Sequence, residues 1–175
     1  GNTPAKMRRA LKGREVIAVK RRGKQIWFEL DQRPWPLFHF GMTGAFHIPG
    51  EAAIRLASSP AKEETDWPPR FTKIHLTFDD GGELVMTNKR RLGRIRLRED
   101  PENEPPISEL GFDPLIDLPS PGLFVERVLS RKAVMKAVLL DQSFAAGVGN
   151  WIADEVLYQA RIDPRRRTDS LSVAE

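Results

Sequence analysis

The sequence predicts an α+β protein in which an incomplete antiparallel β-sandwich precedes a helical domain. Short runs of alternating apolar and polar residues, separated by turn residues, fill residues 1–99. An acidic, proline-rich stretch follows in residues 100–121, and we expect it to be a linker. Apolar residues then recur with helical spacing in residues 122–175, which predicts a separate helical domain.

The strand pattern is clearest where Ile74, Leu76 and Phe78 alternate with polar residues. Asp79-Asp-Gly-Gly82 then offers a hairpin turn, and arginine alternates with apolar residues over 94–98, which favours a half-buried strand. Further strands are expected at residues 16–19, 26–30, 37–40 and 45–48. The proline-containing stretch 49–70 shows little periodicity and is interpreted as a surface insertion.

Two helical patterns meet at a Gly-Val-Gly-Asn turn. Before it, Lys132 and Lys136 fall four apart on one face of a predicted helix. After it, Asn150 stands where an N-cap belongs. Gly147 and Gly149 can adopt positive φ and approach a ligand closely, so amides of the turn can converge on an anion. The same glycines would also serve a plain connection between helices, and spacing alone does not decide between these interpretations.

The net charge of +4 conceals a segregation of charge along the chain. Basic residues gather in residues 1–30 and 89–98, whereas residues 99–117 carry acidic residues and no Lys or Arg. A charge run is more often a solvated face than a binding site. The grouping nevertheless suits a polyanion as partner.

Composition excludes several classes of protein. A chain of 175 residues with 40% hydrophobic residues can bury the core of one domain or two small ones. The absence of Cys excludes disulfides and Cys-ligated zinc within these residues, and the His residues lack metal-ligand spacing. No apolar run approaches the length of a membrane span, and no secretory signal is evident. We expect a soluble, monomeric, intracellular protein without membrane contact, nuclear if it is eukaryotic.

Four motifs carry a family resemblance: Arg22–Gln25, His39–Gly44, Asn88–Gly93 and Leu140–Pro164. Together, and in this order, they resemble the formamidopyrimidine-DNA glycosylase and endonuclease VIII family, and Asn150–Arg161 is most similar to its plant-type branch. The resemblance implies a β-sandwich joined to a helix-two-turns-helix domain. It also implies a base-excision-repair DNA glycosylase/AP lyase that binds damaged double-stranded DNA, excises oxidised purines such as 8-oxoguanine and formamidopyrimidines, and nicks the strand by elimination.

The resemblance assigns roles to individual residues. Lys24 matches the lysine that assists β-elimination, Met42 the residue that fills the void left by the flipped base, and Arg90 the arginine that faces the unpaired base. Leu92 stands where bacterial members place a phenylalanine wedge, and Asn150 with the turn amides would grip phosphates. The remaining candidates for DNA contact are Arg70, Lys73, Arg91, Arg131, Lys136, Gly147 and Gly149.

Lys24 can serve as a proton donor if neighbours such as Arg21 and Arg22 lower its pKa. The family's nucleophile is an N-terminal proline followed by glutamate, and neither occurs here, since Pro4 lies within the chain and precedes Ala. Both ends look cut, because no Met begins the chain and Asp169–Glu175 resembles the start of a helix. The chain is therefore expected to be a fragment that binds damaged DNA without cleaving it.

No cofactor is expected in this chain, and zinc only if a segment beyond Glu175 carries a finger. Two alternatives stay open at this point. One is a non-catalytic paralogue that binds abasic or distorted DNA. The other is a basic RNA-binding protein.

Overall fold

The computed structural model describes residues 3–51 and 66–174 and divides the chain into two compact units. One unit combines Gly1–Pro36 with Leu97–Glu175, and the other is Leu37–Arg96. Each unit is described by itself below.

The first unit begins with helix α1 (Pro4–Leu11), whose N-cap Thr3 accepts a hydrogen bond from the amide of Lys6. An antiparallel hairpin follows, made of β1 (Val16–Arg22) and β2 (Gln25–Leu30), with Arg22 opposite Gln25 at its tight end. This hairpin places the Gly23-Lys24 turn at the tip of two paired strands.

The strands form two sheets, in the orders β1-β2-β3-β7 and β4-β6-β5. The β4/β6 and β5/β6 pairs are antiparallel. In the turn between β5 and β6, the Phe78 amide donates to the Gly82 carbonyl and the Gly81 amide donates to the Phe78 carbonyl. The bounds of the remaining strands are β3 (Trp35–His39), β4 (Gly44–His47), β5 (Thr72–Thr77), β6 (Glu83–Asn88) and β7 (Arg94–Arg98).

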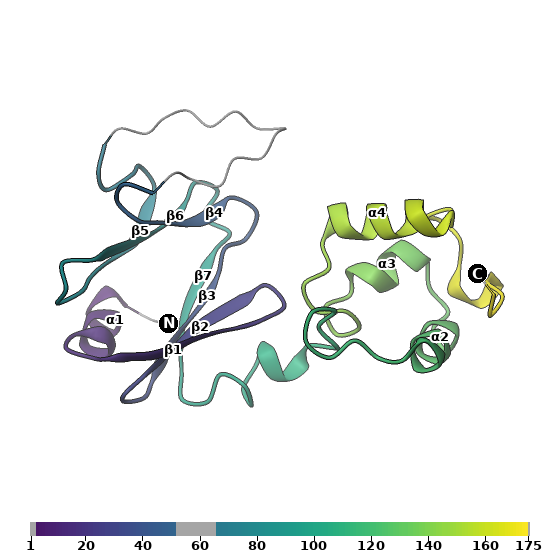
Figure 1. The fold of residues 1–175 in the computed structure, drawn as a ribbon, viewed down its shortest axis with the longest axis horizontal. Coiled ribbons are helices and arrows are strands. Elements are labelled where there is room, and N and C mark those ends of the chain that lie inside the picture. The colour runs from purple at the N-terminus through teal and green to yellow at the C-terminus, as the bar shows by residue number, and fades with distance from the viewer. Residues whose placement is uncertain (1–2, 52–65, 175) are drawn as a thin grey trace. The chain divides into compact units, whose positions relative to one another are not determined.

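Helices follow in the second half of the first unit (Figure 1). They are η1 (Ile107–Glu109), α2 (Pro121–Leu129), α3 (Met135–Leu140), α4 (Asn150–Ala160) and η2 (Thr168–Ser170). Helix α3 contacts α4 across their apolar faces, and the interval 141–149 between them contains the glycine turn. Antiparallel sheets followed by helices confirm the α+β class.

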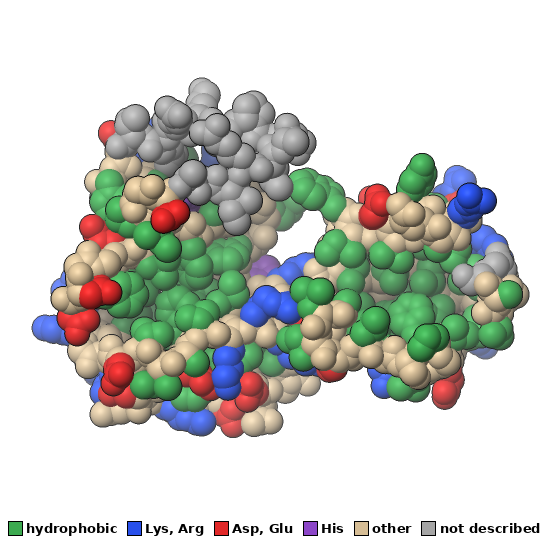
Figure 2. All heavy atoms as spheres, in the orientation of Figure 1, with side chains coloured by type: hydrophobic (Ala, Val, Ile, Leu, Met, Phe, Trp, Pro, Cys, Tyr) green, Lys and Arg blue, Asp and Glu red, His purple; other side chains and the backbone are tan. Residues whose placement is uncertain are grey.

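A hydrophobic core holds the helices together. Phe112, Phe144 and Phe124 pack edge-on or tilted, with ring centroids 5.4–6.0 Å apart. Buried residues from α2, α3 and α4 surround them: Val128, Met135, Val138, Leu139, Ala153 and Leu157. On the face drawn in Figure 2, hydrophobic side chains gather over this helical region. The turn between α3 and α4 is thus fixed by helices packed on both sides of it.

Several expectations need correction. Helix α3 begins at Met135, so Lys132 lies before it and does not share a helix face with Lys136. The stretch 100–121 is folded rather than extended, because Ile107, Phe112 and Asp113 are buried in it. Within the described residues 169–174, the only helical structure is the end of the 3-10 turn η2. Most of the expected insertion 49–70 lies outside the described residues.

Across the described ranges 3–51 and 66–174, no helix combines the length and apolar character needed to cross a bilayer.

Candidate nucleic-acid interface

The turn between α3 and α4 presents backbone amides near a helix N-terminus. Gly147 has φ 91°, as expected, whereas the expectation for Gly149 was wrong because its φ of −114° is ordinary extended backbone. The Gly147 amide donates to the Gln142 side chain at 3.1 Å. The amides of Val148 and Gly149 donate to no acceptor among residues 3–51 and 66–174. Two unpaired amides at the positive end of α4 form a cradle suited to an anion.

Asn150 is the first residue of α4 rather than its N-cap. Gly149 occupies the cap position, and no side chain caps the helix. The expected capping role of Asn150 is therefore wrong. Its side chain is exposed next to the unpaired amides, where it can reach a ligand instead.

Lys24 lies against the same turn although 124 residues separate the two segments. Its Nζ atom donates to the carbonyl oxygen of Val148 at 2.9 Å. Partial desolvation at this position lowers the pKa of the Lys24 ammonium. The expected cause was wrong: Arg21 and Arg22 are neutralised by ion pairs with Asp113 and Asp117.

The approach of the two turns depends on glycine. Gly23 has φ 55°, and a Cβ atom there would lie 3.0 Å from the amide nitrogen of Gly147 and 3.1 Å from Cβ of Ala146. Gly147 in turn faces the Cα of Gly23. The backbone of Gly23 therefore packs directly on the backbone of Gly147. This contact brings the Lys24 side chain next to the unpaired amides of Val148 and Gly149.

In the second unit, Met42 projects from the turn between β3 and β4. Its side chain is 72% exposed, and the turn closes through a hydrogen bond from the Gly44 amide to the Phe40 carbonyl. This exposure shows that Met42 is not packed in the core and leaves its flexible side chain accessible to a partner.

The Met42 turn is joined to the turn that follows β6. The Arg90 guanidinium donates to the Met42 sulfur at 3.4 Å, and the Arg90 amide donates to the Thr43 hydroxyl at 3.3 Å. Gly41 permits close contact, because a Cβ atom there would lie 2.9 Å from the Leu92 carbonyl carbon. The turn 40–44 and the turn 89–93 thus form one continuous surface, in which the Leu92 side chain is 44% exposed.

Asn88, which is 1% exposed, ties these two turns together from within. Its Nδ2 donates to the Phe40 carbonyl at 2.6 Å, and its Oδ1 accepts from the Gly93 amide at 3.2 Å. The motif Asn88–Gly93 was singled out in the sequence, but the bridging role of its first residue was not.

A pocket of about 380 Å³ lies beside these two turns and is lined by Lys73, Met86, Asn88, Arg91, Gly93 and Ile95. Arg91 adopts positive φ (56°), which directs the chain sharply between Arg90 and Leu92. Two of the predicted DNA contacts, Lys73 and Arg91, therefore share one concave surface.

The remaining cationic candidates differ in whether an acidic side chain already pairs with them. Arg131 pairs with Asp141 at 2.8 Å and stacks over Phe144, and Lys136 pairs with Asp154 at 2.6 Å. Arg70 lies over the ring of Phe71, 5.2 Å from its centroid. Arg131 and Lys136 thus stabilise the helical region, and their DNA contacts stay predictions.

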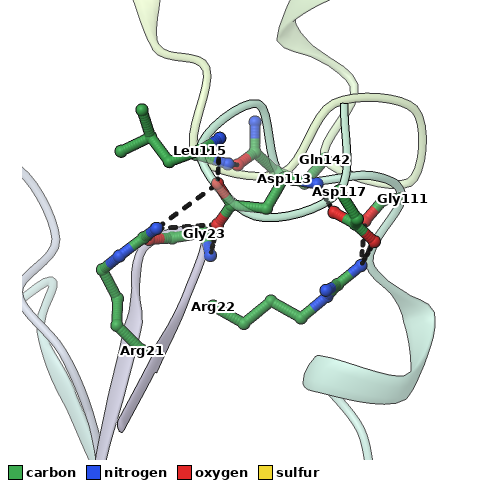
Figure 3. Close-up of polar contacts among 9 residues, drawn as sticks. Arg21, Arg22, Gly23, Gly111, Asp113, Leu115, Asp117 and Gln142 are labelled. Atoms are coloured by element: carbon green, nitrogen blue, oxygen red, sulfur yellow. Dashed lines mark hydrogen bonds and ion pairs between the residues drawn. The ribbon is translucent and has the colours of Figure 1, made fainter. Parts of the chain in front are cut away.

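Sequence reasoning missed Asp113 and Gln142. Figure 3 shows Arg21 directed at Asp113 and Arg22 at Asp117, so acidic residues of the expected linker neutralise part of the basic run. Gln142 braces the glycine turn by accepting from Gly147 and donating to Val148. The opposite charges of residues 1–30 and 99–117 were the available signal for the ion pairs.

Within residues 3–51 and 66–174, no group of His, Asp or Glu side chains is arranged to hold a metal ion.

Two family models match this chain. Residues 1–95 match the formamidopyrimidine-DNA glycosylase N-terminal domain, and residues 110–175 match the H2TH domain of the same family. The chain belongs to the formamidopyrimidine-DNA glycosylase family. It is 43% identical over 98% of its length to the formamidopyrimidine-DNA glycosylase of Arabidopsis thaliana, covering 44% of that protein. With the enzyme of Paracoccus denitrificans it shares 34% identity over 98% of this chain and 59% of the relative.

The higher identity with the Arabidopsis protein agrees with the resemblance to the plant-type branch. The chain spans about half the length of such relatives of the formamidopyrimidine-DNA glycosylase family. Among solved structures, the Lactococcus lactis formamidopyrimidine-DNA glycosylase bound non-covalently to DNA containing an AP site matches with a TM-score of 0.78 at 24% identity. The match covers 97% of this chain and 60% of that one, and it supports the fold.

Proposed function

We propose that this chain is the DNA-binding part of a DNA glycosylase/AP lyase that removes oxidised purines from damaged duplex DNA. The observation that carries the proposal is the position of the Lys24 Nζ, 2.9 Å from the Val148 carbonyl and beside the unpaired amides of Val148 and Gly149. A cation and two amides at a helix N-terminus make a phosphate site. The relatives' structures with abasic and Fapy-dG DNA support the same ligand class.

The proposed chemistry assigns separate tasks to the two units. Lys24 would hold the phosphate beside the lesion, and its lowered pKa would ease proton donation during elimination. Met42 and Leu92 would fill the space vacated by the everted nucleotide, while Arg90 would face the unpaired base. The covalent step needs an amine that attacks C1′ of the sugar, and the family's N-terminal proline would supply it.

The proposal is tested by measuring the affinity of the 175-residue chain for a duplex carrying a tetrahydrofuran abasic analogue, for the intact duplex and for a structured RNA. We expect the abasic duplex to bind most tightly, because only it offers both a flexible phosphate backbone and a void for Met42. Tighter binding of the RNA would contradict the proposal and favour a basic RNA-binding protein.

Borohydride treatment of the chain mixed with abasic DNA tests the covalent step. We expect no trapped adduct with these 175 residues and an adduct once an N-terminal Pro-Glu start is restored, because Lys24 is proposed to bind phosphate and not to attack C1′. A Lys24-dependent adduct would contradict this division of labour.

A further inference from the structure

A buried carboxylate lies directly behind the Lys24 turn. Asp113 is 1% exposed and accepts four hydrogen bonds: from Arg21 Nη1 at 2.7 Å, Arg21 Nη2 at 3.3 Å, the Gly23 amide at 2.7 Å and the Leu115 amide at 3.0 Å. Figure 3 shows Arg21 and Gly23 reaching this carboxylate from the β1–β2 hairpin. Asp113 therefore hydrogen-bonds Gly23, directly before Lys24, and Arg21, three positions before Lys24.

The segment that carries Asp113 is also attached to the glycine turn. The Ala146 amide donates to the Phe112 carbonyl at 2.8 Å, and the Gly111 amide donates to the Gln142 carbonyl at 2.9 Å. One end of this segment thus holds the Lys24 turn, and the other holds the residues that precede Gly147. Among the described residues, only the Asp113 side chain accepts from the Gly23 N–H group, and Arg21 Nη1 donates to the Gly23 carbonyl at 2.9 Å, so Asp113 and the Arg21 that it binds together set where Lys24 leaves the hairpin.

The arrangement requires a carboxylate. Oδ2 accepts from Arg21 Nη1 and the Gly23 amide, while Oδ1 accepts from Arg21 Nη2 and the Leu115 amide. An asparagine in either orientation would turn an NH₂ group toward two donors, so two hydrogen bonds would be lost. Burial by itself raises the pKa of the Asp113 carboxyl, but the hydrogen bonds from Arg21, Gly23 and Leu115 outweigh it and hold that pKa below its usual range.

The neighbouring pair provides a contrast. Arg22 and Asp117 approach to 2.9 Å, but the Asp117 side chain is 47% exposed. An exposed pair of this kind contributes little to stability, because solvent screens it. Asp117→Asn removes the same charge from the same segment and keeps the Oδ1 that accepts from the Asp113 amide.

We propose that Asp113 is a positioning residue that holds Lys24 against the glycine turn and thereby assembles the phosphate site. The inference rests on the proposed function, because it gives Lys24 a phosphate to bind. Asp113 acts through Lys24 and touches no DNA. Its loss should therefore affect binding only while Lys24 is present.

A double-mutant cycle tests this dependence in the 175-residue chain. Asp113→Asn, Lys24→Met, the double variant and the control Asp117→Asn are compared for affinity to the abasic-analogue duplex over a salt series. Lys24→Met should weaken binding roughly tenfold, the size expected for one charge-assisted contact, and reduce the salt slope by about 0.9. Asp113→Asn should approach the same loss, the double variant should lose no more than Lys24→Met, and Asp117→Asn should bind as the unchanged chain does.

Other results would contradict the positioning role of Asp113, the proposed phosphate site, or both. Additive losses, or a loss in Asp117→Asn equal to that in Asp113→Asn, overturn the positioning role and leave the proposed function in place. Unchanged binding of Lys24→Met removes Lys24 from the phosphate site and overturns both. If thermal unfolding shows Asp113→Asn to be unfolded, Arg21→Lys replaces it, because it keeps the charge beside Asp113 but loses the two-pronged contact; its smaller loss should likewise vanish in the Lys24→Met background.

Discussion

Asn150 and Gln159 are exposed amide side chains at opposite ends of α4, and only Asn150 lies beside the unpaired amides. We expect Asn150→Ala to weaken binding of the abasic-analogue duplex at every salt concentration with little change in the salt slope, because a neutral amide releases no counterion. Gln159→Ala, which removes only a contact with Glu155 on the same helix, serves as the control. Unchanged affinity of Asn150→Ala for the abasic-analogue duplex would argue against a phosphate contact.

Met42 is a second prediction at the level of a single residue. Met42→Ala should reduce the preference for the abasic duplex over the intact duplex roughly fivefold to tenfold, or about 1 kcal/mol, because the void would be left unfilled. Binding to the intact duplex should not change, since no charge is removed. Met7→Ala in α1 is the control. Equal losses on both duplexes would indicate that Met42 supports the fold of its turn instead.

Among the elements, the turn between β3 and β4 and the turn after β6 are both held by the buried side-chain amide of Asn88. Asn88→Ala would leave the Phe40 carbonyl and the Gly93 amide without their partner. We expect a loss in the free energy of unfolding of about 1–3 kcal/mol for each group left unpaired, measured by urea denaturation. Asn103→Ala, at an exposed asparagine that contacts Asp100, should cost less than about 0.5 kcal/mol. Similar losses in both variants would contradict the bridging role.

The strands and the glycine turn could be predicted from sequence because their signals are local. Alternation at residues 74–78 and 94–98 and glycine at position 147 report on neighbours along the chain. The start of α3 was misplaced because Ala133 and Val134 are apolar in either conformation. Asn150 was taken for an N-cap on residue type, whereas the backbone changes to helix after Gly149.

For the whole molecule, the contacts that assemble the candidate site join segments far apart in sequence. Lys24 meets Val148, and Arg21 meets Asp113, across separations of 124 and 92 residues. No periodicity within either segment reports such a pairing, so the family motifs identified Lys24 and the glycine turn separately. The acidic stretch 100–121 was interpreted as a linker because composition does not reveal that Asp113 is buried.

The same ion pairs make the stability of the folded chain depend on pH. The hydrogen bonds that Asp113 accepts from Arg21 and Gly23 hold its pKa below its usual value of 3.8 in spite of burial. A carboxyl whose pKa is lower in the folded state than in the unfolded state stabilises the fold above the unfolded value, and this contribution is lost as the pH falls through the folded value. We therefore expect the free energy of unfolding to hold near neutral pH and to fall as the pH drops below about 3.8 towards the lower pKa of the folded state.

Urea denaturation at a series of pH values checks this expectation, with Asp113→Asn as the comparison. The variant lacks the titrating carboxyl, so the stability gap between it and the unchanged chain should be widest at pH 7 and should narrow as the pH falls below about 3.8. Asp117→Asn should show a smaller gap at neutral pH, because the exposed Arg22–Asp117 pair is screened by solvent. A gap for Asp113→Asn that stays constant from pH 7 down to the lowest pH at which the chain remains folded would mean that packing around residue 113, and not its charge, holds the hairpin to the helical region.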